Sequence, residues 1–174
     1  MTDPARSYVS TNRRVREDRR FVAGAGRYVA DLDIPGTLHV ALVASTAPAA
    51  KILGIDTTEA LAMEGVVDVL TGEELSGAVT PLMNGLDTPR VRRFPLAVGQ
   101  IRYAGEWVAA VVAESRAEAE DAAEAVKIKT EKLPFVIDAE AALSEDSPPV
   151  HPDHGSNVLL DRTFVWGTVE EDFA

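Results

Sequence analysis

Two histidines with metal-ligand spacing, His151 and His154, lie near the C-terminal end of the sequence, with Asp153 between them. Imidazole nitrogens are ordinary zinc ligands, so this pair is the natural starting point for a metal-dependent hydrolase. The pair lies in a proline-rich stretch, and no further ligand accompanies it in the sequence. We therefore rank the hydrolase last of three hypotheses and interpret the pair as part of an exposed loop.

Other side chains with catalytic potential lack the partners that catalysis requires. Ser45 and Ser115 stand outside any Gly-x-Ser-x-Gly context, so an activated serine is not indicated. The glycines of Gly24–Tyr28 suit a tight turn, but a dinucleotide loop would need a third glycine where Val29 stands. One predicted helix carries a row of carboxylates that is typical of a solvated face: Glu118, Glu120, Asp121 and Glu124. We predict no catalytic, cofactor-binding or metal-binding residue in this chain.

Composition narrows the class of protein. The 174 residues carry a net charge of −11 and include no cysteine. The acidic balance argues against nucleic acid as a partner, and the lack of cysteine excludes disulfides and iron–sulfur ligation within the chain. The longest apolar run, 107–113, is too short to cross a bilayer, and the first residues lack the apolar centre of a signal peptide. We therefore predict a cytoplasmic location.

Alternating and continuous apolar runs predict short strands over 37–45, 51–56, 66–70, 101–103, 107–114 and 126–131, with an edge strand over 133–138. Helices are expected over 56–63, from Ser115 for about ten residues, and over 139–143. Residues 72–99 are interpreted mainly as a loop, and 157–166 as a last extended segment. The pattern predicts an α+β fold with small mixed sheets and two or three short helices.

Two basic clusters punctuate this acidic chain. Five of the eight residues from Arg13 to Arg20 are arginine, and Arg90, Arg92 and Arg93 follow later. Both could bind anions, but salt-bridged surface is the simpler interpretation. We expect interfaces at the Gly24–Tyr28 turn, the 72–99 loop and the last extended segment.

An ordered series of phrases then spans much of the chain. It includes Phe21-Val-Ala-Gly-Ala-Gly-Arg-Tyr28, Pro35-Gly-Thr-Leu38, Val98-Gly-Gln-Ile-Arg-Tyr103-Ala-Gly-Glu-Trp-Val-Ala-Ala-Val-Val-Ala113 and Glu131-Lys-Leu-Pro-Phe-Val-Ile-Asp138. This series resembles the α/β-hammerhead domain that opens the large subunit of molybdenum hydroxylases, the family of xanthine dehydrogenase and aldehyde oxidase. Ala44-Ser45-Thr46 departs from the Arg-Ser-His or Arg-Ser-Pro of many relatives, which leaves the subfamily open.

The resemblance implies a structural part of an oxidoreductase that hydroxylates a small organic substrate with oxygen from water. It implies a molybdopterin-type molybdenum cofactor, two [2Fe–2S] clusters and often FAD, all held outside this chain. The implied partners are the remaining molybdenum-binding portion, an iron–sulfur subunit and, in some members, a flavin subunit. The rival hypothesis is a free-standing, non-catalytic binding module of the same fold.

The resemblance also implies a division of the chain. Residues 1–20 would form an N-terminal arm, 21–143 the α/β-hammerhead domain, and 144–174 a connector and the start of the cofactor-binding portion. The sequence stops at Phe173-Ala174, near where that portion would begin. We expect either a large subunit encoded in two pieces or a fragment.

Overall fold

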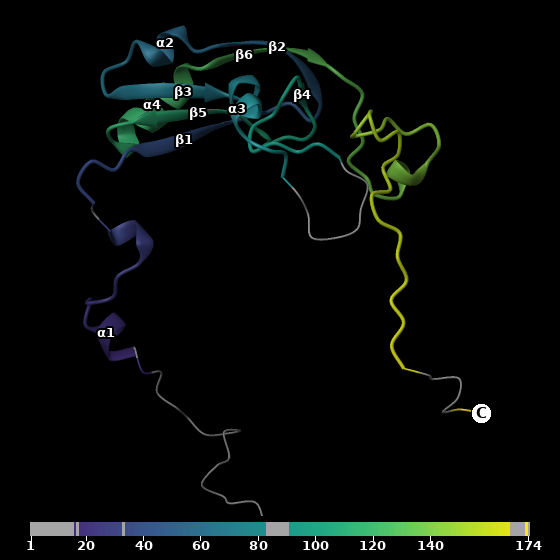
Figure 1. Ribbon diagram of the computed structural model, residues 1–174, viewed down its shortest axis with the longest axis horizontal. Helices are drawn as coiled ribbons and strands as arrows, with labels where there is room; N and C mark the ends of the chain where they lie inside the picture. Colours follow the sequence, from purple (N-terminus) through teal and green to yellow (C-terminus); the bar gives the residue numbers. More distant parts are fainter. Residues whose placement is uncertain (1–15, 17, 33, 83–90, 168–172, 174) are drawn as a thin grey trace, which may run out of the picture. The chain divides into compact units, whose positions relative to one another are not determined.

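The computed structural model describes residues 16, 18–32, 34–82, 91–167 and 173. The chain forms two compact units, 1–37 and 38–174, and each is described by itself. Figure 1 shows the order of helices and strands along the chain.

The described residues of the first unit form a short helix, α1 (Asp18–Val22), and a 3-10 turn, η2 (Val29–Asp31). The aromatic rings of Phe21 and Tyr28 stack with their centroids 5.6 Å apart. Gly24 adopts a φ of +71°, which L-residues with side chains rarely adopt. The backbone there reverses as the sequence predicted. A Cβ at Gly26 would overlap the Phe21 ring, so both glycines serve the turn.

The second unit contains two three-stranded sheets (Figure 1). In the first, the strand order is β1 (His39–Ala44), β5 (Trp107–Ala113), β3 (Val66–Thr71). In the second, it is β4 (Gln100–Ile101), β2 (Ala50–Asp56), β6 (Lys127–Lys132). Each sheet therefore has one central strand and two edges.

The α+β fold is confirmed, but the sheets are antiparallel rather than mixed. Every pairing among the described strands runs antiparallel. The sequence shows two β-α-β runs, and such a run makes a parallel pair only when both strands join the same sheet. Here α2 (Thr58–Leu61) connects β2 to β3, and α4 (Arg116–Ala125) connects β5 to β6. Each of these helices therefore connects a strand of one sheet to a strand of the other.

A further helix, α3 (Gly72–Ala78), occupies the start of the segment interpreted as a loop. Thr71 caps it, because its Oγ1 accepts from the Glu74 N–H at 3.5 Å. In return, the Thr71 N–H and hydroxyl donate to Glu74 Oε2 at 2.9 and 2.7 Å. The Thr71-x-x-Glu74 pattern is a capping box, and the sequence interpretation overlooked it. A Cβ at Gly72 would overlap the Ala97 carbonyl oxygen, which explains glycine at this helix start.

The predicted edge strand over 133–138 is not formed, and the extended segment over 157–166 joins neither sheet. Residues 133–138 and 157–166 contain no regular secondary structure. Pro134 lacks a backbone N–H and so cannot donate to a strand ladder. After β6, only the Leu133 N–H continues the contact, donating to the Ala49 carbonyl at 3.1 Å. The predicted small helix over 139–143 is present as the 3-10 turn η3 (Ala141–Leu143).

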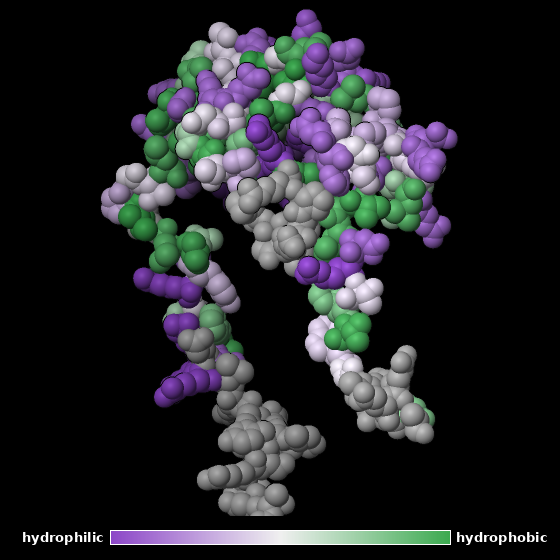
Figure 2. Space-filling view, turned by 45° about the vertical axis from the view of Figure 1, so that its right-hand side comes forward, coloured by the Kyte–Doolittle hydropathy of each residue, from purple (hydrophilic) through white to green (hydrophobic). Residues whose placement is uncertain are grey.

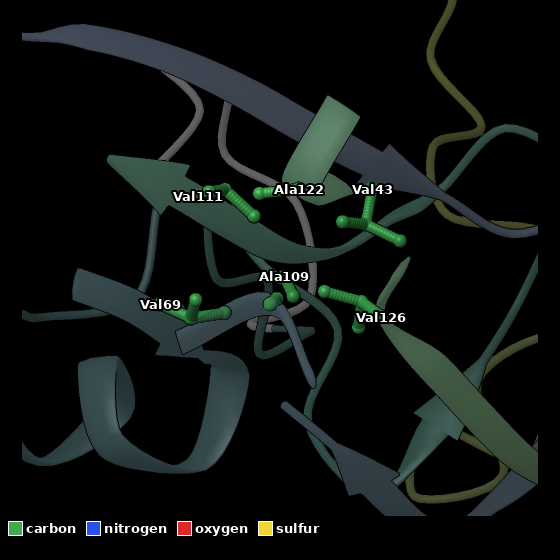
Figure 3. Packing of buried hydrophobic residues seen from close by; sticks show 7 residues of the cluster. Val43, Val69, Ala109, Val111, Ala122 and Val126 are labelled. Carbon is green, nitrogen blue, oxygen red and sulfur yellow. The ribbon is translucent and has the colours of Figure 1, made fainter. Parts of the chain in front are cut away.

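The strand β5 is buried on both faces, as its continuous apolar sequence predicted. Val111 is fully buried in a cluster with Val43, Val69 and Ala122, into which these side chains converge (Figure 3). Val108, on the opposite face of β5, is fully buried with Ala50, Ala97 and Ile101. One strand thus contributes to two clusters, which Ile55 and Ile128 both contact, and Ala122 of α4 belongs to the first.

Candidate functional site

Two adjacent hollows lie where the segment after β6 folds beside the loop that precedes β4. The first has a volume of about 310 Å³ and the second about 190 Å³. Six apolar residues line the first: Val136, Ile137, Ala139, Ala142, Val150 and Leu159. Arg92, Arg102, His154 and Asp153 line the second, and His151 borders both hollows. This is the region of the described chain where polar and apolar side chains converge on open space.

Arg102 is held in place by its own neighbours on the chain. Its Nη1 donates to the Gln100 carbonyl at 3.2 Å and to Glu106 Oε1 at 3.4 Å. Its backbone N–H donates to the second oxygen of the same carboxylate. The side chain of Arg102 is 21% exposed, so its ion pair is only partly screened by water. The guanidinium therefore has a fixed position at the edge of the hollow.

Burial lowers the pKa of His151, and the positive charges of Arg102 and Arg93 lower it further. His154 acts in the same direction, whereas Asp153 opposes it. Desolvation and nearby cations both disfavour an imidazolium. At neutral pH His151 is therefore a neutral imidazole.

The histidine pair lies in a hydrogen-bonded turn. The N–H groups of His154 and Gly155 both donate to the His151 carbonyl, at 2.9 and 3.2 Å. The ring Nε2 of His154 lies 3.1 Å from the Val158 carbonyl. Among the described residues, no three histidine, aspartate or glutamate side chains are placed to hold a metal ion. The hydrolase hypothesis therefore lacks a third ligand in this part of the chain.

The Asn157 side chain holds together the backbone that precedes the turn. Its Nδ2 donates to the carbonyls of Ala142 and Pro148, at 3.1 and 3.2 Å. Its Oδ1 accepts from the Val150 N–H at 2.9 Å. One amide thus ties together three points of a segment that has little regular structure. Nothing in the sequence marked Asn157 for this role, because its partners are carbonyls that any residue could supply.

The two serines considered as nucleophiles have structural roles. Ser45 is buried, and its Oγ accepts from the Ala47 N–H at 3.0 Å. Ser115 caps α4 by accepting from the Glu118 N–H at 3.3 Å. Ser115 and Glu118 have the spacing of a capping box, but only the Ser115 half is formed, because the Glu118 carboxylate lies against Gly65.

The predicted solvated face of α4 is confirmed for Glu120, Asp121 and Glu124, but it is wrong for Glu118, which is half-buried and whose Oε2 is buried without a hydrogen-bond partner among the described residues. The described arginines of the two basic clusters are exposed. On α4, the Arg116 Nε lies 2.7 Å from Glu120 Oε1 in an exposed ion pair. Lys127 Nζ lies 2.6 Å from Glu59 Oε2. Arg92 and Arg93 are both exposed. Arg90 and, in the first cluster, Arg13 and Arg14 lie outside the described residues.

Exposed apolar side chains include those of two segments of the second unit. On β1, Val40 and Leu42 are 60% and 42% exposed, whereas Ala41 and Val43 between and beside them are buried. After the hollows, five residues of the last described segment are exposed: Val158, Leu160, Phe164, Val165 and Trp166. The Phe164 and Trp166 rings stack at 5.6 Å. Figure 2 shows hydrophobic residues, in green, exposed on the face that it presents.

None of the helices in the described ranges is long and apolar enough to cross a membrane.

Comparison with known proteins identifies relatives for most of the chain. The family model described as "aldehyde oxidase and xanthine dehydrogenase, a/b hammerhead domain" matches residues 23–134. The carbon monoxide dehydrogenase large chain of Hydrogenophaga pseudoflava is 37% identical, over 87% of this chain and 20% of the relative. The nicotine 6-hydroxylase large subunit of Paenarthrobacter nicotinovorans is 35% identical, over 91% of this chain and 20% of the relative.

A solved structure has the same fold. The quinoline 2-oxidoreductase of Pseudomonas putida 86 superposes with a TM-score of 0.69 at 41% identity, covering 74% of this chain and 17% of that one. The chain therefore spans about one fifth of the length of the relatives that it matches.

Proposed function

This chain belongs to the family of aldehyde oxidase and xanthine dehydrogenase a/b hammerhead domains, and we propose that it is a structural, non-catalytic part of a molybdenum-binding subunit. The complete enzyme would hydroxylate a small organic substrate with oxygen from water. Residues 21–143 would form the hammerhead domain, and 144–174 would lead toward the cofactor-binding portion. We place the assembly in the cytoplasm.

The donor set of this chain does not suit the cofactors of such an enzyme. The sequence contains no cysteine for an iron–sulfur cluster. In the described ranges no three carboxylate or imidazole groups converge on a metal position. We therefore assign the molybdopterin-type cofactor, the [2Fe–2S] clusters and any FAD to other parts of the assembly, and we assign no reaction step to residues of this chain.

The uncovered apolar surface is the observation that carries this proposal. Phe164, Val165 and Trp166 are 58%, 80% and 80% exposed in consecutive or near-consecutive positions. Contiguous apolar surface of this kind is typical of an interface. The relatives carry the same fold as about one fifth of a longer subunit, whose remainder is the partner that we propose for this surface. An iron–sulfur subunit and, in some members, a flavin subunit would complete the assembly.

Native mass spectrometry with elemental analysis, on protein purified gently from its own source, tests the proposal. We expect this chain to co-purify with larger polypeptides that carry molybdenum and iron. A stable monomer without either metal would contradict the proposal and favour the free-standing binding module. That rival has no specific observation in its favour, since the fold alone does not distinguish a module from a subunit part.

A double substitution, Phe164→Ser with Trp166→Ser, tests which surface makes the contact. We expect the larger partners to be lost from the complex while the domain still folds, because neither side chain belongs to the buried cores. Leu61→Ser is the matched control, since Leu61 is 48% exposed on α2 and outside the segment. Equal retention of partners by the double variant and the control would exclude this segment as the interface.

A further inference from the structure

The two hollows share His151, and their linings differ in chemistry. Six aliphatic side chains surround the first hollow, whereas two arginines and a second histidine border the other. A hollow of about 310 Å³ is at the lower end of the size range of small-molecule sites, which begins at roughly 300 Å³. An apolar compartment beside a cationic one suits a ligand with an apolar body and a negatively charged head.

The charges around the second hollow favour an anion. Arg92 and Arg93 form no ion pair with any described residue. Arg102 uses Nη1 for its hydrogen bonds within the described chain, and its buried Nε has no acceptor there. Two carboxylates oppose these cations, Glu106 on Arg102 and Asp153 on the turn. The cations remain in excess, although the chain as a whole carries a charge of −11.

The apolar hollow contains one carboxylate, and that group is already engaged. Asp138 Oδ1 accepts from the Ala141 N–H at 2.7 Å, which closes the η3 turn. Asn157 also lines this hollow, and its amide forms hydrogen bonds with backbone groups of the same segment. Ser156 Oγ accepts from the Val158 N–H at 3.1 Å, so apart from the His151 ring each polar residue of this lining has a hydrogen bond within the chain. The other lining residues are aliphatic.

We propose that the two hollows form one binding site for a small organic carboxylate. The aliphatic body would lie against Val150 and Leu159, and the carboxylate would face Arg92 and Arg102, with His151 between the two parts. Arg guanidinium groups bind carboxylates through charge-assisted hydrogen bonds. Leu159 lies in the same segment as the exposed Val158 and Leu160, so this site adjoins the interface of the proposed function and rests on that interface leaving the hollow open.

The three histidines of the chain allow the site to be tested by NMR on the full-length protein. Hexanoate is the probe, acetate supplies the head alone, and hexan-1-ol supplies the body alone. We expect hexanoate to shift the His151 ring signals and to bind at least about tenfold more tightly than either fragment. A bound carboxylate favours the imidazolium, so hexanoate should raise the pKa of His151, whereas His39 on β1 serves as the remote internal control.

Variants separate the site from general electrostatics. Arg92→Gln should weaken hexanoate binding about tenfold, and Arg92→Lys should retain most of it. Arg116→Gln removes the same charge from α4 and should leave the affinity unchanged. An unchanged hexanoate affinity in Arg92→Gln would overturn the proposal. Equal shifts of the ring signals of all three histidines would overturn it as well. So would inorganic phosphate binding as tightly as hexanoate, since that result would identify a simple oxyanion site with no use for the apolar hollow.

Discussion

Replacing Val111 by alanine tests the packing of β5 most directly, because this side chain is fully buried in the first core. Removing two methyl groups costs about 1.6 kcal/mol in transfer free energy. Part of the cavity persists, because Ala109 and Ala122 in the same cluster are too small to fill it. We therefore expect the free energy of unfolding to fall by about 2–3 kcal/mol.

Val40→Ala is the matched control on the neighbouring strand. Val40 pairs through its backbone with Val112, and its side chain is 60% exposed on the face opposite the core. The free energy of unfolding should fall by only about 0.5 kcal/mol, because less than half of the Val40 side chain is removed from water and no cavity forms. Loss of β-propensity is common to both substitutions and cancels in the comparison.

Urea unfolding followed by tryptophan fluorescence measures both variants. The two midpoints should differ by the equivalent of about 2 kcal/mol at an unchanged slope. A difference below about 0.5 kcal/mol, or a larger loss in Val40→Ala, would refute the register that places Val111 toward the helix and Val40 toward the outside. A one-residue slip would produce that reversal, since it exchanges the two faces of a strand.

Three further outcomes follow from local contacts. Hydrogen bonds from the hydroxyl and N–H of Thr71 lower the pKa of Glu74 below 4.5. The wild-type protein should therefore be more stable than Glu74→Gln at pH 7 and should lose this advantage as the pH falls through the folded-state pKa of Glu74. Urea titrations at several pH values measure the difference. Gly65→Ala should lower the free energy of unfolding by about 1–2 kcal/mol because of the φ of +78°, and further because the new Cβ would overlap the Glu118 carboxylate. In thermal melts, adding Glu118→Ala to this variant should recover only the loss that comes from the overlap. Burial and then cationic neighbours lower the pKa of His151 from 6.5, so Arg93→Gln should raise it in an NMR titration; an unchanged value would contradict the charge assignment.

The same His151 shift fixes a sign for the pH dependence of stability. A histidine whose folded-state pKa is lowered binds its proton more readily when the chain is unfolded. Its contribution therefore destabilises the fold as the pH falls through 6.5 and is absent at higher pH. His151→Gln should flatten the stability profile in that window, as measured by thermal melts between pH 5 and 8, a range of roughly 1.5 pH units on either side of the ordinary histidine pKa.

Local patterns in the sequence predicted the strands with unbroken apolar or alternating runs. The helix α4 begins after Ser115 and spans ten residues, as its cap and composition predicted. The turn at Gly24 has the positive φ that its glycine suggested. These features succeed because caps, turns and side-chain periodicity depend on residues within one or two turns of each other.

Failures of the sequence interpretation have two different causes. The helix α3 was missed although its signal, Thr71 with Glu74, is local and readable. The edge strand over 133–138 was expected from apolar content, but Pro134 interrupts its donors. In both cases the interpretation followed the composition of the segment, although a more specific local signal was present in the sequence.

Tertiary structure alone decided the pairing of the strands and the site. The sequence presents β2-α2-β3 in order, yet β3 pairs with β5 and β2 pairs with β6. Arg102 and His151 stand far apart in sequence and share the edge of one hollow. Hydrophobic periodicity specifies which face of a strand is buried, but it does not specify which other strand buries it. That choice depends on the packing of the whole domain, and so does every cavity that the packing leaves.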